Sequence, residues 1–215
     1  MKAVALALLC LPLAACQLFF GGDDDGGISV PDADPLAPDA APRPDAHPFP
    51  DGGLCNPVVT QFPIQPSPHV MVGSTVAYTS NPPTSGPHYP VWARWGGTYG
   101  PGVLARSYYV HNLEHGGVVF LVNCPQAGGC PALVAQLQTL QTSLAPDPKC
   151  MATPTTPTRT LIVDDAMLPA GVQVGAAAWG FSYTATCFDE TSLRSFYDDH
   201  FGHATEDTCA NGSVP

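Results

Sequence analysis

The sequence predicts an α+β fold for residues 55–215, in the form of a single disulfide-stapled domain. Strand and helix patterns follow one another in the order strand, strand, helix, strand, strand, helix. This order predicts a mixed or antiparallel sheet with helices packed on one face. The domain also holds six cysteines, an even number that is typical of disulfide-bonded exported domains. The predicted disulfide cysteines are Cys55, Cys124, Cys130, Cys150, Cys187 and Cys209.

The expected strands are apolar or alternate apolar and polar side chains. Residues 69–79 alternate around Gly73, which predicts two short strands or a hairpin. Residues 108–123 predict a strand, a break at Gly116-Gly117, and then a buried strand over 118–122. Further strands are expected over residues 160–163 and, as one longer strand, over residues 172–184.

Two helices are expected from the spacing of apolar residues. Pro131 suits the first position of a helix, and four leucines follow at the spacing of one helical face. Asp189 or Thr191 can cap a last helix, which also carries an apolar stripe. The stripes are Leu133, Leu137, Leu140 and Leu144 in the first helix, and Leu193, Phe196 and Tyr197 in the second.

Pairing of the cysteines is not defined by the sequence. Cys55 opens the domain and Cys209 closes it, which suggests a bridge between the termini. We also expect one local pair among the three cysteines that flank the first predicted helix. Cys124 and Cys130 follow an apolar strand and precede this helix, as in thioredoxin-like redox sites. Their C-x5-C spacing differs from the C-x-x-C of those sites, which makes redox activity the weaker alternative.

The first 15 residues are typical of a secretory signal. One lysine precedes a short apolar run that ends in small residues, and the run is too short to span a bilayer. Leu13-Ala14-Ala15-Cys16 resembles the bacterial lipobox, which implies cleavage before Cys16 and lipidation of that cysteine. We therefore expect an exported protein, lipid-anchored to the bacterial cell envelope at the outer membrane or cell surface. An ordinary signal with a nearby cleavage site is the alternative.

Residues 16–54 are predicted to form the lipidated Cys16 and a disordered acidic linker. Residues 17–54 contain eight Asp and one Arg, a net charge of −7, and their apolar residues show no period. Such a segment buries too little surface to offset its conformational entropy. The acidic run Asp23-Asp24-Asp25 leaves cation binding as an alternative for the linker.

The charge of the chain limits its partners. Lys and Arg total 7 and Asp and Glu total 18, which gives a net charge of −11. Nucleic-acid binding and a polybasic membrane patch are excluded, because both need clustered cations. The membrane is thus expected as a partner only through the N-terminal lipid, and no particular protein or small-molecule partner is indicated.

Histidines carry the strongest chemical signal in the domain. His111-Asn112-Leu113-Glu114-His115 has the H-x-x-E-H spacing of some zinc peptidases, in which two histidines bind the metal and the glutamate acts as base. Because Gly116-Gly117 follows directly, we expect a strand or bend here, and this departs from the helix of those enzymes. His88 lies in a Pro-rich loop expected to be rigid, and His69 opens another strand.

These residues predict a transition-metal site, with zinc or copper as the cofactor. The predicted ligands are His69, His88, His111, Glu114 and His115. Two alternatives remain open. One is a metal-dependent hydrolase with Glu114 as general base, and the other is a non-catalytic envelope interaction domain whose histidines only brace the Pro-rich loop.

Two long motifs resemble the bacterial domain-of-unknown-function family 3105. They are Tyr78-Thr79-Ser80-Asn81-Pro82-Pro83-Thr84-Ser85-Gly86-Pro87-His88-Tyr89 and Val110-His111-Asn112-Leu113-Glu114-His115-Gly116-Gly117-Val118-Val119. The similarity extends over roughly residues 66–207 and includes Trp92, Gly97-Thr98-Tyr99 and Ala178-Trp179-Gly180. It implies an exported or membrane-attached protein without an established activity, and its shared histidines map to His69, His88, His111 and His115, with Glu114. Where the family usually has Gly-Pro-Glu, this chain reads His203-Ala204-Thr205-Glu206, so His200 and His203 fall outside the implied site.

Overall fold

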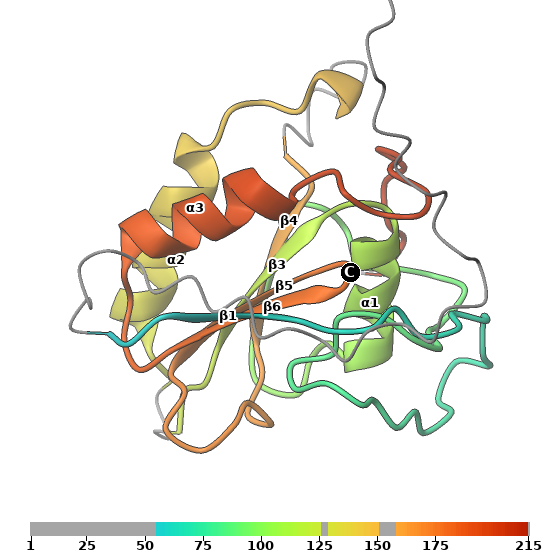
Figure 1. Cartoon of the computed structure of the whole chain (residues 1–215), viewed down its shortest axis with the longest axis horizontal. Helices are drawn as coiled ribbons and strands as arrows, with labels where there is room; N and C mark the ends of the chain where they lie inside the picture. The colour runs from blue at the N-terminus through green and yellow to red at the C-terminus, as the bar shows by residue number, and fades with distance from the viewer. Residues whose placement is uncertain (1–54, 126–128, 151–157, 215) are drawn as a thin grey trace, which may run out of the picture. The chain divides into compact units, whose positions relative to one another are not determined.

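The computed structural model describes residues 55–125, 129–150 and 158–214. A mixed sheet of six strands runs through this part of the chain, with helices on both of its faces (Figure 1). The signal peptide, the lipidated Cys16 and the acidic linker predicted for residues 1–54 lie outside the described ranges. No helix within those ranges is both long enough and apolar enough to cross a membrane.

The sheet has the strand order β1-β6-β5-β3-β4-β2. Strand β4 pairs in parallel with β3 and β2, whereas the pairs β3–β5, β5–β6 and β1–β6 are antiparallel. The prediction of a mixed sheet is therefore confirmed. The strands are β1 (Val58–Gln61), β2 (Thr98–Tyr99), β3 (Val118–Val122), β4 (Thr160–Asp164), β5 (Val174–Ala178) and β6 (Phe181–Ala185).

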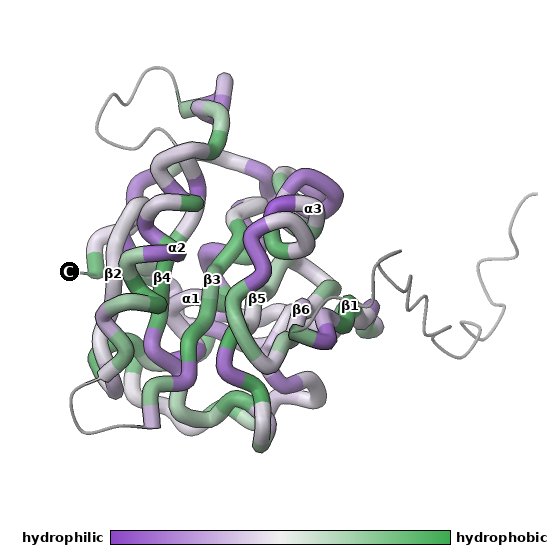
Figure 2. The backbone as a smooth tube through the Cα atoms, turned by 90° about the vertical axis from the view of Figure 1, so that its left-hand side faces the viewer, coloured by the Kyte–Doolittle hydropathy of each residue, from purple (hydrophilic) through white to green (hydrophobic). Residues whose placement is uncertain are grey.

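Helices cover both faces of the sheet, so the prediction that they lie on one face is wrong. Helices α2 (Pro131–Ser143) and α3 (Glu190–His200) pack against Phe120 on one face, and α1 (Arg106–Glu114) packs against Leu121 on the other. The reason lies in β3, which is fully buried along its whole length and apolar at every position. A strand of this kind needs cover on both sides, and Figure 2 shows the hydrophobic character of β3.

Both predicted helices are present. The leucine stripe of α2 is buried, and Asp189 caps α3 by accepting a hydrogen bond from the Ser192 N–H at 3.2 Å. A short 3₁₀ helix, η1 (Pro148–Cys150), follows α2. The strand expected over residues 160–163 is confirmed as β4. Regular spacing of apolar residues was therefore a sound guide for these elements.

The segment that holds the H-x-x-E-H motif is a helix, and the strand or bend expected there is wrong. Gly116 has a positive φ of 82°. The N–H groups of Gly116 and Gly117 donate to the carbonyls of Leu113 and Asn112 at 2.9 and 3.1 Å. This glycine pair therefore ends helix α1 and does not separate two strands. The helix is buried on nearly all sides, so its sequence lacks the amphipathic spacing that predicts a helix.

Three further strand predictions need correction. Residues 69–79 form no hairpin, and their one sheet-like contact is a parallel bridge between His69 and His88. The long strand expected over residues 172–184 is split into β5 and β6 by a turn at Gly180, whose φ is +80°. Strands β1 and β2 were not predicted, because each is short and only partly buried.

Three disulfides join the six cysteines. The local pair is confirmed as Cys124–Cys130, whereas the expected bridge between the domain termini is wrong. Cys55 instead pairs with Cys187 beside β6, and Cys209 pairs with Cys150 in η1. Each end of the domain is thus tied to an internal element.

Candidate metal centre

Four of the five predicted ligands come together. His69, His88, His111 and Glu114 each offer one ligand atom, and all four atoms lie within 4.8 Å of one another. His88, His111 and Glu114 are buried, whereas His69 is exposed. The fifth predicted ligand, His115, lies next to this group but is not part of it. We call these four residues the His/Glu cluster.

Backbone hydrogen bonds hold the two loop histidines side by side. The N–H of Val70 donates to the carbonyl of His88 at 2.8 Å, and the N–H of His88 donates to the carbonyl of Pro68 at 3.2 Å. The loop before His88 is braced in the same way, because the hydroxyl of Ser80 accepts from the Thr84 N–H at 3.1 Å. These hydrogen bonds place the His88 ring beside the His69 ring, with 5.0 Å between the ring centroids.

Helix α1 supplies the other half of the cluster. His111 and Glu114 are three residues apart, so both side chains project from the same face of the helix. The Ser67 hydroxyl donates to Oε1 of Glu114 at 2.8 Å, and Oε2 of Glu114 lies 3.0 Å from Nε2 of His88. The Ser67 hydrogen bond therefore fixes one oxygen of the carboxylate, and the other oxygen faces Nε2 of His88.

Two backbone carbonyls determine which nitrogens of the histidines carry protons. Nδ1 of His88 lies 3.0 Å from the carbonyl of Gly86, and Nδ1 of His111 lies 2.6 Å from the carbonyl of Tyr89. A carbonyl can only accept, so both Nδ1 atoms donate a proton. In the neutral imidazole, Nε2 then carries a lone pair directed into the cluster.

The cluster contains an unsatisfied contact. Nε2 of His88 is buried and lies at ion-pair distance from Glu114, yet it has no hydrogen-bond partner in the described part of the chain. A lone pair facing a carboxylate is repulsive unless a cation lies between them or the imidazole is protonated. Burial lowers the pKa of His111 to about 4, so this ring is neutral at pH 7 and can donate its lone pair.

A family model described as a protein of unknown function, DUF3105, matches residues 69–212, which is more than half of the chain. The chain belongs to the DUF3105 family. This match confirms the resemblance seen in the two motifs. No curated protein and no solved structure matches the chain. The whole His/Glu cluster lies inside the matched region of this DUF3105 protein.

His115 occupies a different position from the four cluster residues. Its Nε2 lies 3.1 Å from Nε2 of His111 and 2.9 Å from Oε2 of Glu206, whereas its Nδ1 is buried without a partner among the described residues. The Trp92 ring covers both histidines, with centroid distances of 4.6 Å to His111 and 4.4 Å to His115. Sequence reasoning missed Glu206, because 91 residues separate it from His115 and no motif links them.

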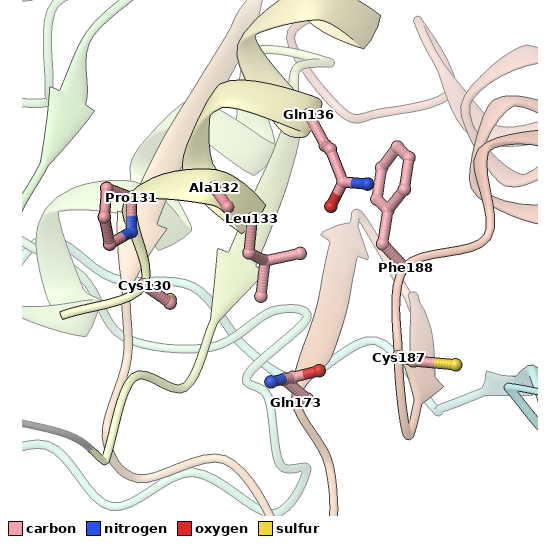
Figure 3. A pocket seen from close by; sticks show the side chains of 8 residues that line it. All are labelled: Cys130, Pro131, Ala132, Leu133, Gln136, Gln173, Cys187 and Phe188. Atoms are coloured by element: carbon pink, nitrogen blue, oxygen red, sulfur yellow. The ribbon is translucent and has the colours of Figure 1, made fainter.

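Other features of the DUF3105 domain do not contribute to the cluster. His200 stacks on Phe181, with 4.0 Å between the ring centroids, on the face of the sheet that α2 and α3 cover. An open pocket of about 470 Å³ lies beside the start of α2 and contains no histidine in its lining (Figure 3). Its lining includes Cys130 and Cys187, and both are paired in disulfides. The pocket therefore shows no group suited to metal binding.

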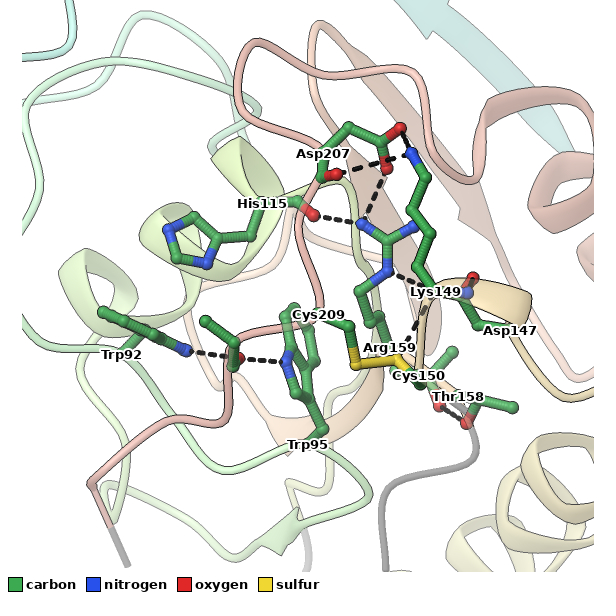
Figure 4. The surroundings of a disulfide bond; sticks show 12 residues. Trp92, Trp95, His115, Asp147, Lys149, Cys150, Thr158, Arg159, Asp207 and Cys209 are labelled. Atoms are coloured by element: carbon green, nitrogen blue, oxygen red, sulfur yellow. Dashed lines mark hydrogen bonds and ion pairs between the residues drawn. A yellow bond between two sulfur atoms is a disulfide. The ribbon is translucent and has the colours of Figure 1, made fainter. Parts of the chain in front are cut away.

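The C-terminal segment of residues 206–214, which we call the C-terminal strap, runs along the end of α1. The N–H groups of Glu206 and Thr208 donate to the carbonyls of Glu114 and His115 at 3.1 and 3.2 Å. The Cys150–Cys209 disulfide and the buried Arg159 hold the strap in place (Figure 4). Arg159 contacts the carbonyl of His115, Asp147 and Asp207 of the strap.

Proposed function

We propose that this DUF3105 domain binds a divalent transition-metal ion, zinc or copper, through His69, His88, His111 and Glu114. The observation that carries the proposal is the contact between His88 and Glu114. With the His88 imidazole neutral, two groups that both accept hydrogen bonds face each other at 3.0 Å in a buried setting, and the Gly86 carbonyl orients the imidazole. A metal ion between them would satisfy both.

The donor set fits these metals. Imidazole nitrogens suit zinc and copper, and one carboxylate is a common fourth ligand. The bonds from His88 and His111 to backbone carbonyls support the proposal further, because histidine ligands nearly always donate their second N–H to such an acceptor. When bound, the metal would supply a Lewis-acidic centre. The chain would orient the lone pairs of the histidine nitrogens toward the metal and exclude water from the buried side of the site.

The geometry favours metal binding or handling over hydrolysis. Four protein donors would fill a tetrahedral shell, whereas a catalytic zinc usually keeps one position for water. Oε1 of Glu114 also accepts a hydrogen bond from the Ser67 hydroxyl, and in this proposal its other oxygen binds the metal, which argues against its action as a general base. The exposed His69 offers a route by which an ion can enter and leave.

We also propose that the domain is exported and anchored to the cell envelope by lipid on Cys16. Support comes from the three disulfides, which form and persist in oxidising compartments outside the cytoplasm. Labelling of cells with radioactive palmitate tests this proposal. The native chain is expected to incorporate label and a Cys16→Ala chain to incorporate none, whereas equal labelling of both would contradict it.

Metal analysis of the full chain tests the metal proposal. The chain is purified without an affinity tag and titrated calorimetrically with Zn²⁺ and then with Cu²⁺. We expect one bound ion per chain, and for His88→Ala a loss of affinity larger than the roughly 10- to 100-fold found when a group behind a ligand is removed, because one of four ligands is lost. His203→Ala is the matched control, since His203 is exposed and lies outside the cluster.

Two results would contradict the proposal. The first is the absence of binding by the native chain for both ions. The second is a His88→Ala chain that is less stable but binds metal as the native chain does, which would favour the interaction domain whose histidines only brace the loop.

A further inference from the structure

We propose that His115 and Glu206 set the metal affinity of the His/Glu cluster without ligating the metal. In this proposal His115 is a positioning residue whose Nε2–H is shared between the lone pair of His111 and the carboxylate of Glu206. The inference rests on the proposed metal site and assigns a role to the C-terminal strap.

The proton of His115 belongs on Nε2. Both potential acceptors, Nε2 of His111 and Oε2 of Glu206, lie within 3.1 Å of that atom. Nδ1 of His115 is buried and has no acceptor in the described ranges. A buried N–H without an acceptor is more unfavourable than a buried lone pair whose ring donates elsewhere. With the proton on Nε2, His115 has no lone pair there to offer a metal, so this proposal gives His115 a role other than the ligand role expected from the sequence.

The lone pair of His111 can be used only once. Its Nδ1 already donates to the Tyr89 carbonyl, so its Nε2 either accepts the proton of His115 or binds the metal. Metal binding thus requires that the N–H of His115 turn to another acceptor. Glu206 is that acceptor, and its negative charge makes it the stronger partner.

The C-terminal strap determines whether Glu206 is available. The backbone N–H of Glu206 donates to the backbone carbonyl of Glu114, and the Thr208 N–H donates to the backbone carbonyl of His115. The strap is therefore attached to the end of the helix that carries the cluster. Cys209 then ties the strap to Cys150. A docked strap therefore keeps the N–H of His115 away from His111, and a displaced strap lets it compete with the metal.

A double-mutant cycle tests this competition. We expect Glu206→Ala to weaken Zn²⁺ binding by about ten- to a hundredfold, the range found when groups behind a ligand are removed. His115→Phe keeps a ring beside Trp92 but has no N–H, so it is expected to bind Zn²⁺ at least as tightly as the native chain. The double variant should recover the affinity lost in Glu206→Ala. Glu206→Gln, which retains an uncharged acceptor, should fall between the native chain and Glu206→Ala.

Glu190→Ala is the matched control, because Glu190 and Glu206 are similarly exposed, at 54% and 50% of their side chains, and each has one ion-pair partner. It should leave Zn²⁺ affinity unchanged. Melting temperatures of all metal-free chains are measured first, since a merely structural role predicts that the double variant loses at least as much affinity as Glu206→Ala. That result, or native affinity in Glu206→Ala, would overturn the inference while the metal site stands. If the native chain binds no metal, the proposed function fails and this inference fails with it.

Discussion

The face of the sheet covered by α2 and α3 is built from regular elements, whereas much of the face covered by α1 is built from loops. The first face packs leucines of α2 and aromatics of α3 against β3. The second combines α1 with loop residues such as Trp95 and Leu104, and the buried cluster histidines lie beside it. Strand carbonyls are occupied by the sheet ladder, but loop carbonyls such as those of Gly86 and Tyr89 are free to orient imidazole rings.

The difference suggests that one face mainly stabilises the domain and that the other mainly orients the polar groups of the site. Regular elements on the α2/α3 face form one of the two buried apolar cores that stabilise the domain. Loops on the α1 face hold polar groups in orientations that regular elements do not offer. Stability and metal affinity should therefore respond to different substitutions.

Removal of single disulfides should give the largest difference between an effect on stability and an effect on metal affinity. Replacing Cys55 and Cys187, 132 residues apart, by Ala should lower the free energy of unfolding by about 5 kcal/mol and leave Zn²⁺ affinity unchanged. Replacing Cys150 and Cys209, 59 residues apart, should lower it by about 4 kcal/mol and also weaken Zn²⁺ binding, because the strap is released. Urea unfolding and calorimetric titration at a temperature where each chain is folded measure both effects. Equal losses of Zn²⁺ affinity in the two variants would contradict the expectation that only the disulfide of the strap affects the metal site.

A cavity in the α2/α3 face should reduce stability alone. Leu137 is fully buried against β3, so Leu137→Ala should lower the free energy of unfolding by about 2–5 kcal/mol. Zn²⁺ affinity of the folded variant should stay at the native value, as measured by calorimetry. A large drop in affinity would mean that the two faces are coupled through the sheet.

Zinc should stabilise the native chain through the α1 face. At a free Zn²⁺ concentration of 100 times the dissociation constant, binding should add about 2.7 kcal/mol to the free energy of unfolding. His88→Ala should show almost none of this gain, whereas Leu137→Ala should keep it in full. Melting curves with Zn²⁺ and with a chelator provide the measurement, and a gain retained in His88→Ala would place the metal elsewhere.

Acid should destabilise the protein through the buried His111 on one face and the half-buried His200 on the other, and this is the smallest of the four expected effects. Burial lowers the pKa of His111 to about 4 and also lowers the pKa of His200. Below pH 6.5 the unfolded chain therefore binds protons that the folded chain does not, so stability is complete above pH 6.5 and falls as the pH drops toward 4. His200→Asn should reduce this fall in metal-free protein, as melting curves between pH 7 and pH 5 would show. An identical pH dependence in His200→Asn would assign the whole effect to the α1 face.

Much of the α2/α3 face could be predicted from the sequence, because its elements repeat apolar residues at regular intervals. The leucines of α2, the Asp189 cap and strand β4 all follow from local patterns. Helix α1 could not be predicted in the same way. Burial on nearly all sides removed its amphipathic spacing, and Gly116 ends the helix in a position that equally suits a break between strands.

The sequence by itself determined the residue types of the candidate site, the presence of one local disulfide among Cys124, Cys130 and Cys150, and the membership in the DUF3105 family, because these depend on short motifs. Only the tertiary structure decided that His115 lies outside the cluster and that Glu206 lies beside it. It also decided the pairing of Cys150 with Cys209. The physical reason is that each of these contacts joins segments far apart in the chain, so their positions depend on how loops and helices pack and not on local spacing.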